Sequence, residues 1–218
     1  MQLPGANQRS FFEKATALYQ SQLQTDAAGQ AYLTGRGITA EVAGRFRLGV
    51  VRQPIVGHER FGGRLSIPYV TPAGVVNFTF RCLVAQCMRC KASADEGGHA
   101  KYLNTQLDTT LYNVGDLATP SQTIHVCEGE LDALTLSAAG LPAIGAPGVK
   151  NWKPWYSICL ADFAEVFVWA DPDVAGRKFA SFLEKELKAR RVALPPGEDC
   201  SDYYLRAGAE GLRKLIER

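Results

Sequence analysis

The 218-residue chain is long enough to bury a full hydrophobic core, as one large domain or two small ones. Its composition, with 46% apolar and 21% charged residues, is that of a soluble globular protein, and no apolar run approaches the ~20 residues that a membrane span requires. The N-terminus lacks a signal-peptide pattern and the six cysteines form no obvious disulfide framework. We therefore expect a cytoplasmic protein with no membrane partner.

The net charge of +2 is unevenly distributed along the chain. Residues 1–110 carry twelve Lys/Arg against seven Asp/Glu, and residues 111–218 carry twelve against fifteen. A basic half beside an acidic half suits a polyanion on one surface and a metal ion on the other. Taken alone, the asymmetry is explained as well by chance on solvated faces.

The first half of the chain reads as short helices followed by a β-hairpin. Each helical pattern follows a capping Ser, Asp or Thr, and the patterns cover residues 11–23, 27–33 and 40–46. A strand over 65–70, a turn at Thr71-Pro72-Ala73-Gly74 and a strand over 75–81 form the hairpin. These elements carry no evident chemistry by themselves.

Three cysteines and a histidine follow the hairpin. Cys82, Cys87 and Cys90 precede His99, and the Cys87-x-x-Cys90 spacing is that of a zinc knuckle. The Cys82–Cys87 spacing is looser. A Cys₃His zinc site is one interpretation, and incidental cysteines in a flexible loop are the other.

From residue 123 onward, strands alternate regularly with helices. Strands are expected over 123–127, 143–145, 165–170 and 191–194, and helices over 131–139, 152–160, 175–190 and from about 209. This alternation predicts an α/β fold with a mainly parallel sheet flanked by helices. We place the boundary between the two domains, 1–118 and 119–218, just ahead of the first of these strands.

Acidic residues follow three of the expected strands. Glu128 and Asp132 follow the first, Asp171 and Asp173 follow the third, and the last is followed by Asp199 and Asp202. The carboxyl ends of parallel strands open on one edge of the sheet, so these carboxylates should gather there. Their mutual repulsion is tolerable if cations lie between them, and an oxygen-only donor set favours Mg²⁺ or Mn²⁺.

Two separate stretches resemble known families. Glu128-Gly129-x-x-Asp132 followed by Asp171-x-Asp173-x-x-Gly176 resembles the Toprim signature, found in bacterial-type primases, topoisomerases and some nucleases. The phrases Tyr32-Leu33-Thr34-Gly35-Arg36-Gly37-Ile38 and Arg45-Phe46-Arg47-Leu48-Gly49 are similar to the start of the DnaG-like primase catalytic core. The resemblance implies a Toprim-type sheet preceded by a smaller α+β subdomain, and the length is similar to compact primases of bacteriophages.

The resemblance implies a role for each residue of the carboxylate site. Glu128, Asp171 and Asp173 are the expected catalytic residues, and the expected metal ligands are these three with Asp199 and Asp202. Gly129 and Gly176 are expected to let the backbone approach closely, and Asp132 to orient the site.

In the first half, the resemblance places Arg64, Arg81 and Lys101 at the nucleic acid and nucleotide groove. The reaction it implies is nucleotidyl transfer in DNA replication: synthesis of a short RNA primer from NTPs on single-stranded DNA, giving an RNA–DNA hybrid. A replicative helicase or a zinc-binding module would act in trans. Two alternatives remain open, a metal-dependent Toprim nuclease and a non-catalytic Toprim DNA-binding module.

Overall fold

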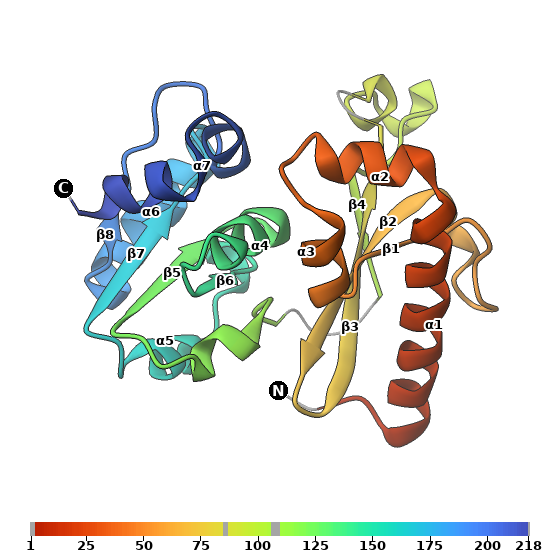
Figure 1. Cartoon of the computed structure of the whole chain (residues 1–218), viewed down its shortest axis with the longest axis horizontal. Coiled ribbons are helices and arrows are strands. Elements are labelled where there is room, and N and C mark those ends of the chain that lie inside the picture. The colour runs from red at the N-terminus through yellow and green to blue at the C-terminus, as the bar shows by residue number, and fades with distance from the viewer. Residues whose placement is uncertain (1–2, 85–86, 106–109, 218) are drawn as a thin grey trace. The chain divides into compact units, whose positions relative to one another are not determined.

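Two four-stranded sheets organise the chain, one antiparallel and one parallel (Figure 1). The computed structural model describes residues 3–84, 87–105 and 110–217. The chain divides into two compact units, Met1–Asp108 and Thr109–Arg218.

In the first unit the strand order is β1-β2-β3-β4, and every neighbouring pair is antiparallel. The strands are β1 Gly49–Val50, β2 Arg64–Thr71, β3 Gly74–Cys82 and β4 Tyr102–Asn104. The helices are α1 Ala6–Thr25, α2 Ala27–Thr34 and α3 Ala40–Arg45, and short 3-10 turns cover Glu59–Phe61, Met88–Cys90 and Ala94–Glu96. The expected hairpin is β2–β3; β1 and β4 were not predicted, because two or three residues are too few to show a strand pattern.

Local chemistry explains where the first helices begin. The Asp26 carboxylate accepts from the Gly29 N–H at the start of α2, and the Thr39 hydroxyl accepts from the Val42 N–H at the start of α3, so both predicted caps are confirmed. Helix α1 begins at Ala6, earlier than the predicted cap at Ser10. Residues 6–10 continue the helix because none of them breaks it, so Ser10 is a helical residue.

Aromatic packing holds α1 against the antiparallel sheet. The Phe12 ring on α1 meets the Phe78 ring on β3 edge to face, with centroids 5.4 Å apart. Tyr19 lies about two turns further along α1 and contacts Phe78 and Phe80. The hairpin turn ends at Gly74, whose φ of +100° is a conformation that a residue with a Cβ rarely adopts.

The second unit is an α/β layer structure. Its parallel sheet has the order β6-β5-β7-β8. The strands are β5 Thr123–Cys127, β6 Ala143–Gly145, β7 Glu165–Trp169 and β8 Arg190–Arg191. The helices are α4 Glu130–Ala138, α5 Pro154–Leu160, α6 Val174–Leu187 and α7 Cys200–Ile216, with 3-10 turns over Val114–Ala118 and Val149–Asn151. The expected parallel sheet flanked by helices is confirmed.

Helices cover both faces of this sheet. Alternate residues of β5 point to opposite sides, so Ile124 and Val126 pack with α5 and α6, whereas Cys127 lies near α4 and α7. Helix α7 begins at Cys200; the helix expected from about residue 209 is its second half, and its first half was not predicted. The non-helical Gly208, with φ +67°, kinks α7 and interrupts its periodicity.

The segment ahead of β5 belongs to the second unit. Tyr112 forms an antiparallel bridge with Gly145, and the Asp116 carboxylate accepts from the Ala143 N–H at 2.9 Å. Leu111 and Leu117 pack with the second unit's apolar cluster. The division therefore falls ahead of the boundary expected after residue 118.

Among the helices that the structure describes, none is both long and apolar enough to cross a lipid bilayer.

Candidate active site

The carboxylates that follow β5 and β7 lie at one edge of the parallel sheet. The two strands are direct neighbours, with Cys127 paired to Trp169 at their carboxyl ends. Glu128 comes immediately after β5, and Asp171 comes two residues after β7. The structure therefore brings together the acids of the first and third predicted strands.

Electrostatics indicate that Asp171 and Asp173 lie near Glu128. The pKa of Glu128 is raised to about 7, first by burial and then by the nearby charges of Asp171 and Asp173. Glu128 Oε1 is buried with no hydrogen-bond partner in the described part of the chain. A buried carboxylate that has two other carboxylates nearby suits a cation, which would both neutralise and coordinate it.

Two of the expected metal ligands also cap helices. Asp173 Oδ1 accepts from the Gly176 N–H at 2.8 Å and begins α6. Asp199 Oδ1 accepts from the Asp202 N–H at 2.8 Å and begins α7. Each cap uses one carboxylate oxygen, which leaves the second available, and fixes the side chain at a helix N-terminus.

The start of α7 approaches the same edge of the sheet. Ser201 Oγ donates to Asp132 Oδ1 on α4 at 3.3 Å. The pKa of the Cys200 thiol is raised by burial, and then by Asp132, Asp199 and Asp171. Asp199 therefore stands near the acids of β5 and β7. Asp202 is exposed on the first turn of α7, and its backbone N–H makes the contact with Asp199.

Glycine at two positions lets neighbouring atoms pack closely at this site. A Cβ at Gly129 would lie 2.6 Å from Asp132 Oδ2, so the carboxylate packs directly against the start of α4. A Cβ at Gly176 would lie 2.2 Å from the Asp171 carbonyl oxygen. Each glycine thus permits a close approach that no other residue allows.

The acids at this edge offer oxygen donors, which fit Mg²⁺ or Mn²⁺. The carboxylates are not drawn together into a closed coordination cage. Within the described residues, the one group of three or more ligand atoms that all lie within 4.8 Å of one another is formed by Cys82, Cys87, Cys90 and His99.

In the first unit, Arg81 lies between two tyrosine rings. Its guanidinium carbon is 5.0 Å from the centre of the Tyr102 ring and 5.8 Å from that of Tyr32, and Nη1 donates to the Tyr102 hydroxyl. The arginine is 6% exposed, and its Nε has no hydrogen-bond partner in the described residues. Sequence reasoning missed both tyrosines, although Tyr32 stands in a phrase that resembles primases.

The side chains of Arg64 and Arg81 point to opposite faces of the antiparallel sheet. Arg64 pairs with Cys82, and Leu65 pairs with Arg81. Paired residues point to the same face, and successive residues alternate. Arg64 is buried and its Nη1 donates to the Lys101 carbonyl at 3.3 Å. Lys101 itself is exposed, with Nζ 5.7 Å from the centre of the Tyr102 ring.

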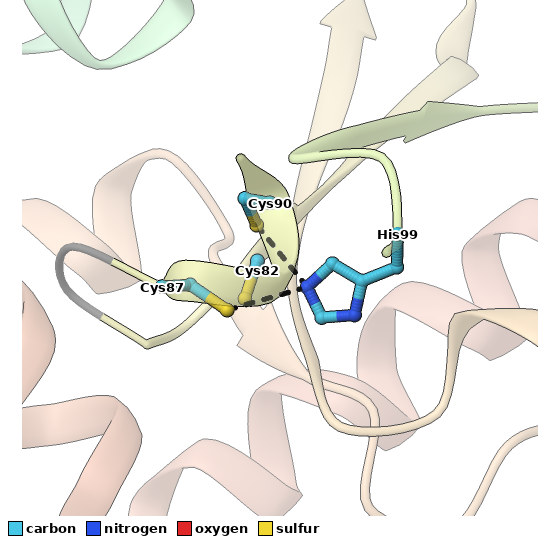
Figure 2. Close-up of side chains that lie close together, drawn as sticks. All are labelled: Cys82, Cys87, Cys90 and His99. Atoms are coloured by element: carbon cyan, nitrogen blue, oxygen red, sulfur yellow. Dashed lines mark hydrogen bonds between the residues drawn. The ribbon is translucent and has the colours of Figure 1, made fainter. Parts of the chain in front are cut away.

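The cysteines and the histidine that sequence analysis singled out converge at the end of β3. His99 Nε2 lies 3.5 Å from Cys87 Sγ and 3.1 Å from Cys90 Sγ (Figure 2). All three thiols are free. Partial burial lowers the pKa of His99, and the charges of Arg64 and Arg89 add to this, which keeps the ring neutral.

A parallel sheet with acids beyond β5 and β7, preceded by an antiparallel α+β unit, defines a Toprim protein with a primase-type core. The Toprim-like family model matches residues 125–204, which include β5, β7 and both acidic clusters. The gene 57 protein of Mycobacterium phage D29 is 30% identical over 158 residues, covering 72% of this chain and 99% of the phage protein. The chain belongs to the family of DnaG-like primase cores, as a relative of this phage protein.

Bacterial primases show the same relationship over a longer stretch. The DNA primase of Haemophilus influenzae is 25% identical over 247 residues, covering 97% of this chain and 42% of the primase. This chain thus matches about two fifths of that primase's length. The RNA polymerase domain of Mycobacterium tuberculosis primase DnaG matches with a TM-score of 0.77 at 24% identity, covering 99% of this chain and 84% of the other. The same domain has been solved with a double-stranded DNA oligomer that carries a 6-nucleotide overhang.

Proposed function

We propose that this chain is a DNA primase catalytic core, which synthesises short RNA primers from NTPs on single-stranded DNA. The observation that carries the proposal is the Glu128 carboxylate at the sheet edge of a primase-type fold, whose pKa is raised by burial and then by Asp171 and Asp173. Family membership supports the same assignment.

In this proposal Mg²⁺ or Mn²⁺ is held by Asp171, Asp173 and Glu128, with Asp199 at the margin. The ion, when bound, neutralises the charge that develops on the phosphate oxygens. Asp202 is the weakest of the expected ligands, because it is exposed and contacts Asp199 through its backbone.

We also assign Glu128 a role as the general base. The 3′-oxygen of the growing primer bonds to the α-phosphorus of the incoming NTP, and pyrophosphate leaves. The 3′-hydroxyl proton must be removed, and the Glu128 carboxylate is the group at this site that is assigned to accept it. Asp132 orients the site through Ser201 and the start of α4.

The first unit supplies the contacts to nucleic acid. Arg81 is a buried cation, and no ion pair involving it is present in the described residues, so an incoming phosphate is a suitable partner. Exposed Lys101 neutralises backbone phosphate beside it. Arg64 acts less directly, by holding the Lys101 carbonyl.

The product is an RNA–DNA hybrid, made in the cytoplasm, or in the host cytoplasm if the protein is phage-encoded. We propose that a replicative helicase or a zinc-binding module acts in trans. The solved primase of Aquifex aeolicus contains zinc-binding and RNA polymerase domains, which supports a partnership of this kind. The group of Cys82, Cys87, Cys90 and His99 takes no part in phosphoryl transfer, because four protein ligands leave no open position.

Primer synthesis on single-stranded DNA with labelled ribonucleotides and Mg²⁺ or Mn²⁺ tests the proposal. We expect short RNA from the wild type and none from Asp171→Ala or Glu128→Gln. Asp162→Asn is the matched control, since Asp162 is an exposed acid ahead of β7, at the opposite end of that strand.

The same assay separates the alternatives. Metal-dependent shortening of the DNA or RNA, abolished in Asp171→Ala, would replace the primase assignment with a Toprim nuclease. DNA binding without synthesis or cleavage, also after a primase zinc-binding module and a helicase are added, would identify a non-catalytic binding module.

A further inference from the structure

In the described part of the segment between β3 and β4, little apolar surface is buried. Between Leu83 and Ala100, no side chain whose exposure is described is buried. Val84 and Met88 are 62% and 75% exposed. A segment with so little buried apolar surface needs some other cross-link to hold one conformation.

Backbone hydrogen bonds shape this segment around its sulfur atoms. The Cys90 N–H donates to the Cys87 carbonyl at 3.1 Å, which closes the tight turn that brings the two thiols together. The His99 N–H donates to the Arg89 carbonyl at 2.8 Å, which brings the imidazole back over that turn. Cys82, the last residue of β3, brings a third thiol to the same group.

The four side chains point toward one another, and the His99 nitrogen that faces the thiols is Nε2 (Figure 2). In a tetrahedral site with Zn–S bonds of about 2.3 Å, neighbouring ligand atoms stand roughly 3.5–3.8 Å apart. The His99 contacts, 3.5 Å and 3.1 Å, lie close to that spacing. All ligand atoms of the group fall within 4.8 Å of one another.

We propose that Cys82, Cys87, Cys90 and His99 bind one structural Zn²⁺, which fixes the segment between β3 and β4 to the antiparallel sheet. Three thiolates and a neutral imidazole form a donor set typical of closed structural zinc sites. This site belongs to the first unit and is independent of the carboxylates that the proposed primase reaction uses.

The site is coupled to the strands beside it through the backbone. The Cys82 N–H donates to the Lys101 carbonyl at 2.9 Å, and Arg64 donates to the same oxygen. Zinc at Cys82 and His99 therefore holds the chain on both sides of this hydrogen bond. Removal of the ion is expected to loosen β4, whose residues pair with Thr79, Phe80 and Arg81.

Zinc content is the first measurement. Metal analysis of protein purified without added zinc or chelator should give one zinc ion per chain in the wild type, and background zinc in Cys90→Ser. Cys159→Ser is the matched control, because Cys159 is an exposed free cysteine on α5. Glu128→Gln should also keep its zinc, since it alters only the carboxylate site.

Replacing His99 by another zinc ligand distinguishes loss of the metal site from unfolding of the protein. His99→Cys creates a Cys₄ set, which also binds zinc, so it should retain the ion, whereas His99→Ala should lose it. Cobalt substitution gives a second readout: thiolate-to-metal charge transfer and tetrahedral d–d bands in the wild type, absent in Cys87→Ser. Wild-type protein that is folded but neither contains nor takes up zinc would overturn the proposal. So would zinc that persists in Cys90→Ser, a Cys87–Cys90 disulfide in the purified protein, or the absorption of an iron–sulfur cluster.

Hydrogen exchange tests the coupling. After zinc is removed by chelation, the amides of Tyr102–Asn104 should exchange faster, while those of β5 and β7 should be unchanged. Unchanged protection of Tyr102–Asn104 would mean that the ion does not support β4.

Discussion

Gly176 lies directly against the backbone of Asp171. A Cβ at Gly176 would be 2.2 Å from the Asp171 carbonyl oxygen and 2.8 Å from its amide nitrogen, closer than any side-chain atom can stand. This packing fixes the position of the first turn of α6 relative to the end of β7. It therefore sets the distance between Asp171 and Asp173.

Gly176→Ala should therefore impair catalysis more than stability. The added methyl pushes α6 away from the sheet edge and moves Asp173 relative to Asp171. A displacement of about 1 Å in a catalytic site can cost on the order of 100-fold in rate. Primer synthesis and thermal melting check this, with Gly115→Ala as the control, since nothing lies within 4 Å of a Cβ there. Equal activity of Gly176→Ala and Gly115→Ala would contradict it.

The raised pKa of Glu128 predicts a pH-dependent stability. The usual pKa of Glu is 4.5, and in the folded chain that of Glu128 is about 7, so between these values the folded state holds a proton that the unfolded chain has released. The free energy of unfolding should fall as pH rises through this window. One pH unit of separation corresponds to about 1.4 kcal/mol, and solvent screening reduces the effect to about 1–2 kcal/mol in all.

Urea unfolding in EDTA at pH 5 and pH 8 measures this effect as a difference between wild type and Glu128→Gln. The comparison is needed because buried His125, whose pKa is lowered to about 4, acts in the opposite direction. Glu128→Gln should gain stability at pH 8 and not at pH 5. An equal effect of the substitution at both pH values would show that Glu128 titrates normally.

Two substitutions separate the two roles of Asp173. Asn retains a side-chain oxygen that can cap α6, but it lacks the charge that a cation needs. Asp173→Asn should lose primer synthesis with little change in melting temperature. Asp173→Ala should lose synthesis and about 1 kcal/mol of stability as well. Isothermal titration with Mn²⁺ completes the test, and full Mn²⁺ affinity in Asp173→Asn would remove Asp173 from the ligand set.

Arg81 should contribute to nucleic-acid binding through its planar, positively charged guanidinium group. Arg81→Lys keeps the charge but loses the stacking against Tyr32 and Tyr102, and we expect about 10-fold weaker binding of a single-stranded oligonucleotide. Arg190→Lys is the control, because Arg190 forms an exposed ion pair with Glu165. Fluorescence anisotropy at two salt concentrations measures both. If Arg81→Lys binds DNA like the control while melting at a lower temperature, Arg81 has a structural role only.

The parts of the fold with strong local signals were predictable. Thr39 and Asp26 precede helical patterns and cap helices, and the alternation from residue 123 gave the parallel sheet. The same cap chemistry at Asp199 was overlooked, because Gly208 interrupts the pattern of α7 and concealed its first half. The resemblance gave Asp199 and Asp202 as expected ligands, but it did not show that Asp199 Oδ1 also accepts from the Asp202 N–H.

Tertiary relationships were beyond a single sequence. The burial of Arg81 and its stacking on Tyr32 depend on α2 packing near β3, a contact between residues about fifty positions apart. The opposite faces of Arg64 and Arg81 follow from the β2–β3 register, which shifts by one residue at an irregularity between Tyr69 and Val70. By contrast, the convergence of Glu128 and Asp171 followed from strand order alone, because parallel neighbours share an edge.

The different pairing of the two sheets also determines how the protein folds. The β2–β3 hairpin joins strands that are adjacent in the sequence, so it can close rapidly. In the parallel sheet, Thr123 pairs with Glu165, and a helix, a strand and a second helix separate them in the sequence. Pairing of these distant strands is expected to be slower than closure of the hairpin. The antiparallel unit is thus expected to form first, and the edge that carries Glu128 and Asp171 to be assembled late. The appearance of cation binding during refolding would then mark completion of the native state.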